Sequence, residues 1–170
     1  MELATPRLLL RAWRAGDGTA LVREADDPRV SQFLRDRFPS PYLREHADFW
    51  IAHAGSQQPL TDFAIVRDGE PIGGIGLEML PDVASIGAEI GYWLGVRHWG
   101  QGYASEAVAA ITAYAFDTLE LLRVQAGVYA PNVASARVLE KCGFEREGTL
   151  RHAVRKRGAV LDVHLYARVR

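Results

Sequence analysis

The clearest hydrophobic pattern in the chain lies at residues 89–94, where successive side chains alternate between two sets, Ile90, Tyr92 and Leu94 against Gly91 and Trp93. A period of two residues is typical of a β-strand, and we predict this strand over residues 85–94. Residues 95–102 are rich in glycine, and the apolar stripe that follows has helical spacing, which predicts a helix over residues 104–117. The chain therefore runs from a strand through a tight loop into a helix.

The same periodicities predict further strands at residues 8–10, 61–67, 71–80, 123–130, 144–155 and 160–169. They also predict helices at 17–25, 42–54 and 131–143 and a helical turn at 30–34, with Asp17 as the cap of the first helix. This order indicates an α/β (α+β) fold with a mixed sheet and helices on both faces. Ligands of such sheets bind beyond the carboxyl ends of the strands.

Composition places the chain among ordinary globular proteins and removes several classes of function. At 170 residues it is expected to be one domain, 1–170, with 48% hydrophobic and 24% charged residues. A net charge of −1 argues against a general nucleic-acid binder. No apolar run approaches the roughly 20 residues of a membrane span, and the N-terminus has no signal-peptide pattern. We therefore expect a cytoplasmic protein that contacts neither membrane nor nucleic acid directly.

Cysteine and histidine offer little chemistry. Cys142 is the one cysteine, which excludes an internal disulfide and suits a reducing compartment. Its spacing from Val138 and Leu139 predicts a buried thiol rather than a nucleophile. The five histidines have no metal-ligand spacing, so we predict no metal site.

The glycine loop at the start of the predicted helix has the features of an anion site. The first backbone N–H groups of a helix lack partners inside the helix, and the helix dipole adds partial positive charge there. Gly100 and Gly102 remove side chains that would keep an anion away, and Arg97 at the loop entrance would add a charged donor. A plain strand-to-helix turn is the alternative. A dinucleotide fingerprint fails at Ser105, and no P-loop sequence is present.

The spacing Arg97-x-x-Gly100-x-Gly102 resembles the signature of the GNAT N-acetyltransferases, in which Gln or Arg precedes the two small residues and the loop seats the pyrophosphate of acetyl-CoA. A second block follows from Asn132 to Phe144, and residues 89–94 and 100–107 are similar to the RimJ/RimL branch, which acetylates the N-termini of ribosomal proteins. The resemblance covers nearly the whole chain, from residue 7 to the end. It implies a GNAT fold with a mostly antiparallel sheet of six to seven strands, of which strands 4 and 5 splay apart.

The resemblance also implies acetyl-CoA as the acetyl-donating cosubstrate and assigns residues to it. Backbone N–H groups of the loop would hold the pyrophosphate, aided by the Ser105 hydroxyl, and the other loop residues in this set are Gly100, Gln101, Gly102, Tyr103 and Ala104. Leu94 and Val96 match the positions whose backbone pairs with the pantetheine arm, and Trp93 would lie near the thioester. Asn132 would contact the cofactor near its thiol, although an asparagine here also makes a good helix N-cap.

Two residues are candidates for catalysis. Glu89 is the only acid on the central strand, and a carboxylate in a partly dry cleft can take a proton from an amine directly or through water. A salt bridge within the sheet is the alternative. By the RimL resemblance, Ser135 would protonate the departing CoA thiolate, since the tyrosine that other members use is replaced by Leu139. The implied reaction is direct acetyl transfer to a primary amine in a ternary complex.

The acceptor and the partners depend on the resemblance alone. The RimJ/RimL branch favours a protein N-terminal α-amine, such as that of a ribosomal protein. A polyamine or aminoglycoside acceptor and a non-catalytic acyl-CoA-binding module are alternatives, and a homodimer is left open. Five aromatic residues would line the acceptor side or belong to the core: Phe33, Phe38, Tyr42, Phe49 and Trp50. A basic cluster in the last hairpin is either a solvated turn or a surface for an acidic partner: Arg151, His152, Arg155, Lys156 and Arg157.

Overall fold

The structure is a computed structural model that describes residues 1–170. Eight strands form one sheet: β1 (Glu2–Ala4), β2 (Leu9–Arg11), β3 (Asp62–Arg67), β4 (Glu70–Met79), β5 (Gly87–Leu94), β6 (Arg123–Tyr129), β7 (Glu145–Lys156) and β8 (Ala159–Val169). Five α-helices accompany it: α1 (Gly18–Ala25), α2 (Pro28–Ser31), α3 (Arg44–Gly55), α4 (Tyr103–Asp117) and α5 (Val133–Lys141). Short 3-10 turns occur at Ala15–Asp17, Asp82–Ala84 and Val96–His98.

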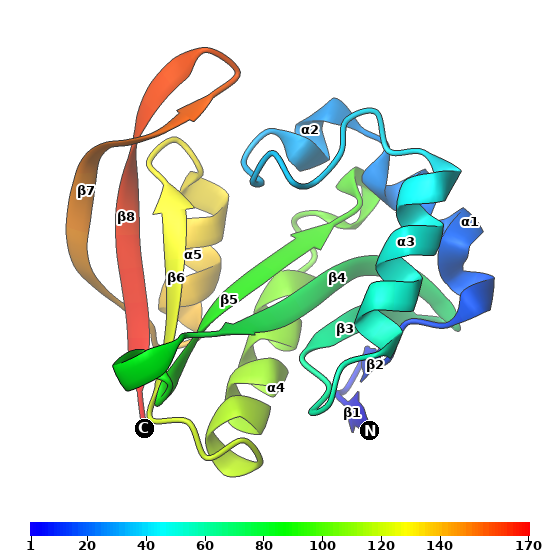
Figure 1. The fold of residues 1–170 in the computed structure, drawn as a ribbon, viewed down its shortest axis with the longest axis horizontal. Helices are drawn as coiled ribbons and strands as arrows, with labels where there is room; N and C mark the ends of the chain where they lie inside the picture. The colour runs from blue at the N-terminus through cyan, green and yellow to red at the C-terminus, as the bar shows by residue number, and fades with distance from the viewer.

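The sheet has the strand order β1-β2-β3-β4-β5-β6-β8-β7, and all neighbours are antiparallel except β5 and β6. These two strands pair over three residues only, from Gly87–Arg123 to Glu89–Gln125, and then diverge. Figure 1 shows the resulting V between them. The mixed sheet and its splayed central pair confirm the predicted fold class.

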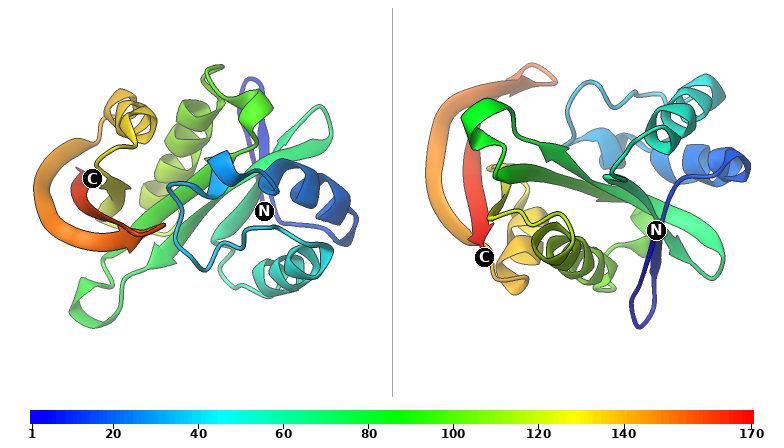
Figure 2. Two further views of the ribbon diagram at one scale, coloured as in Figure 1. Left: turned by 90° about the horizontal axis from the view of Figure 1, so that it is seen from above. Right: turned by 60° about the horizontal axis from the view of Figure 1, so that its bottom comes forward.

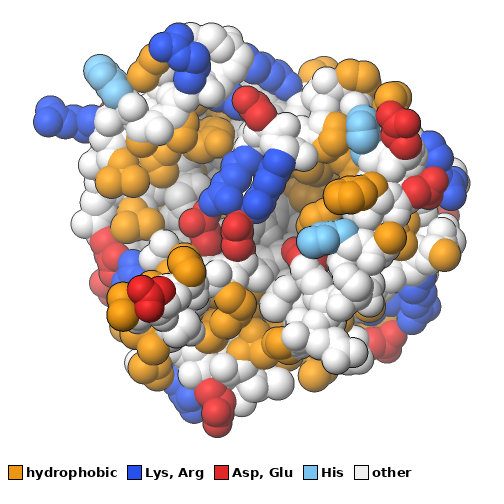
Figure 3. Space-filling model, viewed as in Figure 1, with side chains coloured by type: hydrophobic (Ala, Val, Ile, Leu, Met, Phe, Trp, Pro, Cys, Tyr) orange, Lys and Arg blue, Asp and Glu red, His pale blue; other side chains and the backbone are white.

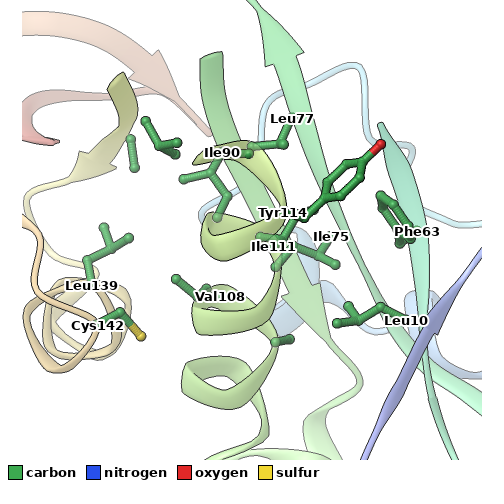
Figure 4. Packing of buried hydrophobic residues seen from close by; sticks show 14 of the residues in the cluster. Leu10, Phe63, Ile75, Leu77, Ile90, Val108, Ile111, Tyr114, Leu139 and Cys142 are labelled. Carbon is green, nitrogen blue, oxygen red and sulfur yellow. The ribbon is translucent and has the colours of Figure 1, made fainter. Parts of the chain in front are cut away.

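Helices cover both faces of the sheet, as Figure 2 shows. Alternation along β5 decides which residue faces which layer, because successive side chains of a strand point to opposite faces. Ile90 and Leu94 belong to the larger core. Figure 4 shows Ile90 in this core with Val108 and Ile111 of α4. Burying each such side chain contributes about 2 kcal/mol. Trp93 faces the other layer, where α1 and α3 pack.

Two sequence predictions about local structure are wrong in detail. The sheet gains the strand β1, whose three residues pair with β2 but are too few to give a periodic pattern. The Asp17 side chain does not cap α1. Its carboxylate instead accepts two hydrogen bonds from Arg11, at 2.7 and 2.9 Å, and one from the Arg14 backbone. A buried arginine on β2 thus takes the carboxylate that sequence alone assigns to the helix end.

Cys142 is buried, as predicted. Burial raises the pKa of its thiol, and its Sγ lies 3.2 Å from the backbone oxygen of Ser105. No helix of the chain combines the length and the apolar character needed to cross a membrane.

Candidate active site

The glycine loop continues directly from the end of β5, and α4 runs back from it beneath the sheet (Figure 1). Gly100 and Gly102 have φ angles of 72° and 81°, in the left-handed region that side chains disfavour. Gly102 is also the N-cap residue of α4. The two glycines therefore allow the left-handed backbone of the loop, and they also leave the start of α4 without covering side chains.

Three contacts hold this loop in place. Arg97 forms an ion pair with Glu24 of α1, whose side chain is 3% exposed. The indole Nε1 of Trp99 donates to the backbone oxygen of Leu94 at 2.9 Å. Arg7 donates to the backbone oxygen of Gln101 at 3.0 Å. Sequence reasoning assigned Arg97 to an anion and missed its partner Glu24, which lies 73 positions away.

The backbone N–H groups of residues 100–105 donate to no acceptor within the protein. They surround the first turn of α4, where the helix dipole is positive. A loop that is anchored from behind and has unused donors in front matches the requirements of a bound diphosphate. The residues present therefore fit the predicted pyrophosphate seat, in which Ser105, Tyr103 and Ala104 form the first turn of the helix.

Leu94 and Val96, the two positions assigned to the pantetheine arm, lie in different secondary-structure elements. Leu94 ends β5 with its side chain buried in the larger core. Val96 begins the 3-10 turn that leads into the loop, so it is not part of the strand. The edge of β5 beyond Glu89 has no strand partner on the β6 side, which leaves room for an extended chain in the V.

At the start of α5, Asn132 acts as the helix cap, because its Oδ1 accepts the Ser135 backbone N–H at 3.2 Å. Ser135 Oγ lies 2.8 Å from the hydroxyl oxygen of Tyr92 on β5. Burial raises the pKa of the Tyr92 hydroxyl, although its hydrogen bond to Ser135 opposes the rise. Sequence reasoning missed Tyr92 as a site residue, because its alternation with Gly91 and Trp93 indicated a strand and nothing about its contacts.

A cavity of about 750 Å³ opens between the V and the segment that carries α3. Glu89, Trp93, Asn132 and Ser135 all line it, so both candidate catalytic residues share one space. All five aromatic residues predicted for the acceptor side line it as well: Phe33, Phe38, Tyr42, Phe49 and Trp50. In the space-filling view, basic and acidic side chains meet over the hollow in the middle of this face (Figure 3).

Glu89 is 29% exposed at its side chain and pairs with Arg35, from the segment between α2 and α3. Arg35 also lies 3.1 Å from Glu78, the β4 neighbour of Glu89, and Arg37 lies 2.7 Å from the same carboxylate. The sequence allowed a salt bridge of Glu89 within the sheet. The observed partner comes instead from the segment that crosses the cavity.

Two side chains of the basic cluster in the last hairpin contact other parts of the protein. Lys156 is 8% exposed, and its Nζ lies 2.6 Å from Asp36. Arg157 donates to Ser31 Oγ and to the Pro28 carbonyl, both at 2.8 Å. Figure 1 shows the β7–β8 tip arching toward α2. The solvated-turn interpretation is thus wrong for Lys156, which is buried, whereas Arg157 is exposed and contacts α2.

The fold, the splayed strands and the glycine loop define an acetyltransferase of the GNAT type. The model of the Acetyltransferase (GNAT) domain matches residues 7–145, and the chain belongs to this family. It is an acetyl-CoA-dependent N-acetyltransferase that resembles the RimJ/RimL branch.

Individual relatives agree with this assignment. The chain is 33% identical over 169 residues to an uncharacterized N-acetyltransferase p20 of Bacillus licheniformis, covering 97% of this chain and 94% of the relative. It is 36% identical over 107 residues to the ribosomal-protein-serine acetyltransferase of Escherichia coli, covering 63% and 59%. Among solved structures, Mycobacterium smegmatis RimJ in complex with CoA-disulfide has a TM-score of 0.84 at 27% identity, covering 99% of this chain and 86% of the other.

Proposed function

We propose that this enzyme acetylates the N-terminal α-amine of a protein or peptide, with a ribosomal protein as the favoured acceptor. Similarity to the E. coli ribosomal-protein-serine acetyltransferase and to RimJ supports this choice of acceptor. The single observation that carries the chemistry is the shared cavity, in which Glu89 and Ser135 line one space beside the splayed strands. A ribosomal acceptor would be met in the cytoplasm, so the cytoplasmic expectation follows from this proposal. The homodimer stays a prediction.

Acetyl-CoA supplies an acetyl thioester, and the chain's own groups position it. The free N–H groups of residues 100–105 bind the diphosphate. The unpaired edge of β5 binds the pantetheine arm, and Trp93 and Asn132 stand beside the reacting end. Holding both reactants side by side supplies a large part of the acceleration, and a backbone N–H near Trp93 is the proposed donor to the oxyanion.

Glu89 is the proposed base. An amine is protonated near neutral pH and attacks only after losing its proton, which the Glu89 carboxylate accepts directly or through water. In the structure this carboxylate is paired with Arg35. The acceptor's ammonium group therefore competes with Arg35 for Glu89, and this exchange places the amine next to the base.

Ser135 is the proposed acid, because its hydroxyl lies at the start of α5 on the β6 side of the V. A CoA thiolate is a good leaving group, so protonation by Ser135 adds less than deprotonation by Glu89. We expect the Ser135→Ala change to lower kcat less than the Glu89→Gln change.

The test measures release of the CoA thiol with a panel of peptides that have free N-termini and with small amines. We expect release with free N-termini and none with N-acetylated peptides. Glu89→Gln should lower kcat by about a hundredfold and change the pH profile of the reaction. Glu145→Gln, an exposed acid at the start of β7, is the matched control. Absence of release with every amine would overturn the function, whereas an unchanged pH profile would exclude only Glu89.

A small cationic amine is the second candidate acceptor. The chain is 26% identical over 125 residues to an aminoglycoside N(6')-acetyltransferase type 1 of Klebsiella pneumoniae. The specific observation in its favour is that three carboxylates line the cavity, Asp62, Glu78 and Glu89.

A further inference from the structure

Asp62 is a carboxylate of the cavity that the proposed chemistry does not use. It is the first residue of β3 and lies opposite Gly76 of β4, which in turn lies opposite Gly91 of β5. Residues that are paired across antiparallel strands point to the same face. Asp62 therefore faces the same side of the sheet as Glu78 and Glu89, which are paired with each other two residues further along.

The two glycines beside Asp62 leave the floor of the cavity without side chains. A Cβ atom at Gly76 would lie 2.1 Å from Asp62 Oδ1, so the carboxylate rests directly on the glycine backbone. A Cβ atom at Gly91 would meet nothing within 4 Å, which means that the space above it is open. Between Asp62 and the proposed base Glu89, no side chain of Gly76 or Gly91 therefore fills the cavity floor.

The charges of the cavity are unequally paired. Glu78 and Glu89 form ion pairs with Arg35 and Arg37, but Asp62 forms none. One Asp62 oxygen, Oδ2, accepts a hydrogen bond from the Gln57 side chain, and Oδ1 has no donor. Burial raises the pKa of Asp62, against the opposing effects of Gln57, His53 and Arg37. A cation beside Oδ1 would form an ion pair with Asp62, which has none within the chain.

The surroundings also suit a cation. Trp50 of α3 lines the same cavity as Asp62. An aromatic ring in the same cavity as a partly buried carboxylate favours an ammonium group. Strand spacings place the Cα atoms of Asp62 and Glu89 about 12 Å apart, and both side chains point into the cavity between them. A short aliphatic chain with an ammonium group at each end spans this gap.

We propose that Asp62 binds a second ammonium group of the acceptor, so that the preferred substrate is a primary amine with another positive charge a few carbons away. The source of this charge is either a free diamine or the side chain of a lysine at the N-terminus of a peptide. This inference rests on the proposed function and specifies its acceptor.

The first test compares putrescine and cadaverine with butylamine and pentylamine, and a peptide that begins with lysine with the same peptide that begins with norleucine. For the wild type, kcat/KM should be about tenfold higher for the doubly charged member of each pair. Asp62→Asn keeps the shape of the side chain but removes its charge, and should bring each ratio close to one. Which pair has the larger kcat/KM identifies the source.

Asp68→Asn, in the exposed turn after β3, is the matched control and should keep the wild-type ratios. In the wild type, the Asp68 side chain is 85% exposed and lies outside the cavity. Calorimetric binding of CoA to Asp62→Asn reports whether the variant is folded. Calorimetry of putrescine on the CoA complex gives a second measurement that needs no turnover, with about tenfold weaker binding expected for Asp62→Asn.

Equal kcat/KM for singly and doubly charged amines, or ratios that survive the Asp62→Asn change, would overturn the role of Asp62 and leave the acetyltransfer proposal standing. Failure of every amine to release CoA would overturn the proposed acceptor chemistry, and putrescine binding that depends on Asp62 would then still support the cation site.

Discussion

The hydroxyl group of Tyr92 is close to two oxygen atoms of Ser135, the side-chain Oγ at 2.8 Å and the backbone carbonyl at 3.3 Å. Because burial raises the pKa of Tyr92 from its ordinary value of 10.0, the hydroxyl keeps its proton across the neutral range. Tyr92 has one hydroxyl hydrogen, and when it donates this hydrogen to Oγ, the serine's own hydrogen is free to point into the cavity. Tyr92 is therefore a positioning residue for the proposed acid.

The Tyr92→Phe change should lower kcat by about three- to tenfold, an effect on the order of one net hydrogen bond, while the affinity for CoA stays the same. Without the tyrosine, Ser135 has no fixed orientation. Steady-state kinetics at saturating acetyl-CoA measures the effect. Tyr166→Phe, which loses a hydrogen bond to Glu140 outside the cavity, should leave kcat unchanged. If Tyr92→Phe lowers kcat as much in a Ser135→Ala background as in the wild type, the coupling through Ser135 is wrong.

Sequence reasoning at this scale found residues with a family pattern and missed residues defined by distant contacts. Glu89 and Ser135 were predicted from their places in two blocks, and both line the cavity. The partners of these residues were not predicted. Tyr92 lies 43 positions from Ser135, and Arg35 lies 54 positions from Glu89. No local pattern marks such pairs, because the fold alone brings them together.

At the scale of elements, the glycine loop depends on α1. Glu24 is 3% exposed at its side chain and contacts Arg97, Arg23 and His98. A Cβ atom at Gly95 would lie 2.1 Å from Glu24 Oε2, so the loop begins in direct contact with this carboxylate. The carboxylate of α1 thereby fixes the turn Val96–His98 that leads into the glycine loop.

The Glu24→Gln change should lower the free energy of unfolding by about 2 kcal/mol, because it removes one partner of a buried charge network whose arginines are partly exposed. The affinity for CoA should fall as well, since the loop loses its anchor. Urea denaturation and calorimetry measure the two effects. Glu70→Gln is the matched control, because Glu70 pairs with the same Arg23 but is 66% exposed. Equal stability of both variants would contradict the anchoring role of Glu24.

The stabilisation by Glu24 should depend on pH in one direction. Burial raises the pKa of Glu24, but hydrogen bonds from Arg97 and Arg23 outweigh it and the net pKa is lowered. A carboxyl group with a lowered pKa in the folded state stabilises the protein above its unfolded pKa, and this stability is lost as the pH falls through the folded value. The difference in unfolding free energy between wild type and Glu24→Gln should therefore shrink in acid.

The elements themselves were largely predictable, because hydrophobic periodicity is local. The strand over residues 85–94 and the helix over 104–117 lie within two residues of β5 and α4 as observed. The strand β1 and the partner of Asp17 were not predictable, since both depend on β2 as a neighbour. The divergence of β5 and β6 came from the family resemblance, and no residue pattern within either strand indicates it.

At the scale of the whole molecule, the segment between α2 and α3 crosses the cavity and is held from two sides. Arg35 and Arg37 tie it to the carboxylates of β4 and β5, and the Phe38 ring lies 5.4 Å from the Trp93 ring between centroids. The tip of the β7–β8 hairpin holds it from the opposite side, through Lys156 and Asp36. Contacts from β4 and β5 on one side and from the β7–β8 hairpin on the other therefore both fix the position of this segment, which sets the width of the acceptor space.

The Lys156→Met change should raise KM for the acceptor amine about fivefold, because the hairpin no longer holds Asp36 and the crossing segment is less often in its observed position. The buried stem of Lys156 is preserved by methionine, so the fold should be kept. The affinity for CoA should not change, since the glycine loop contacts neither partner. Lys141→Met, at the exposed end of α5 and the other lysine of the chain, is the control and should leave KM unchanged. Steady-state kinetics and calorimetry decide the question, and a rise in KM accompanied by an equal loss of CoA affinity would show that the hairpin supports the whole site rather than the acceptor side.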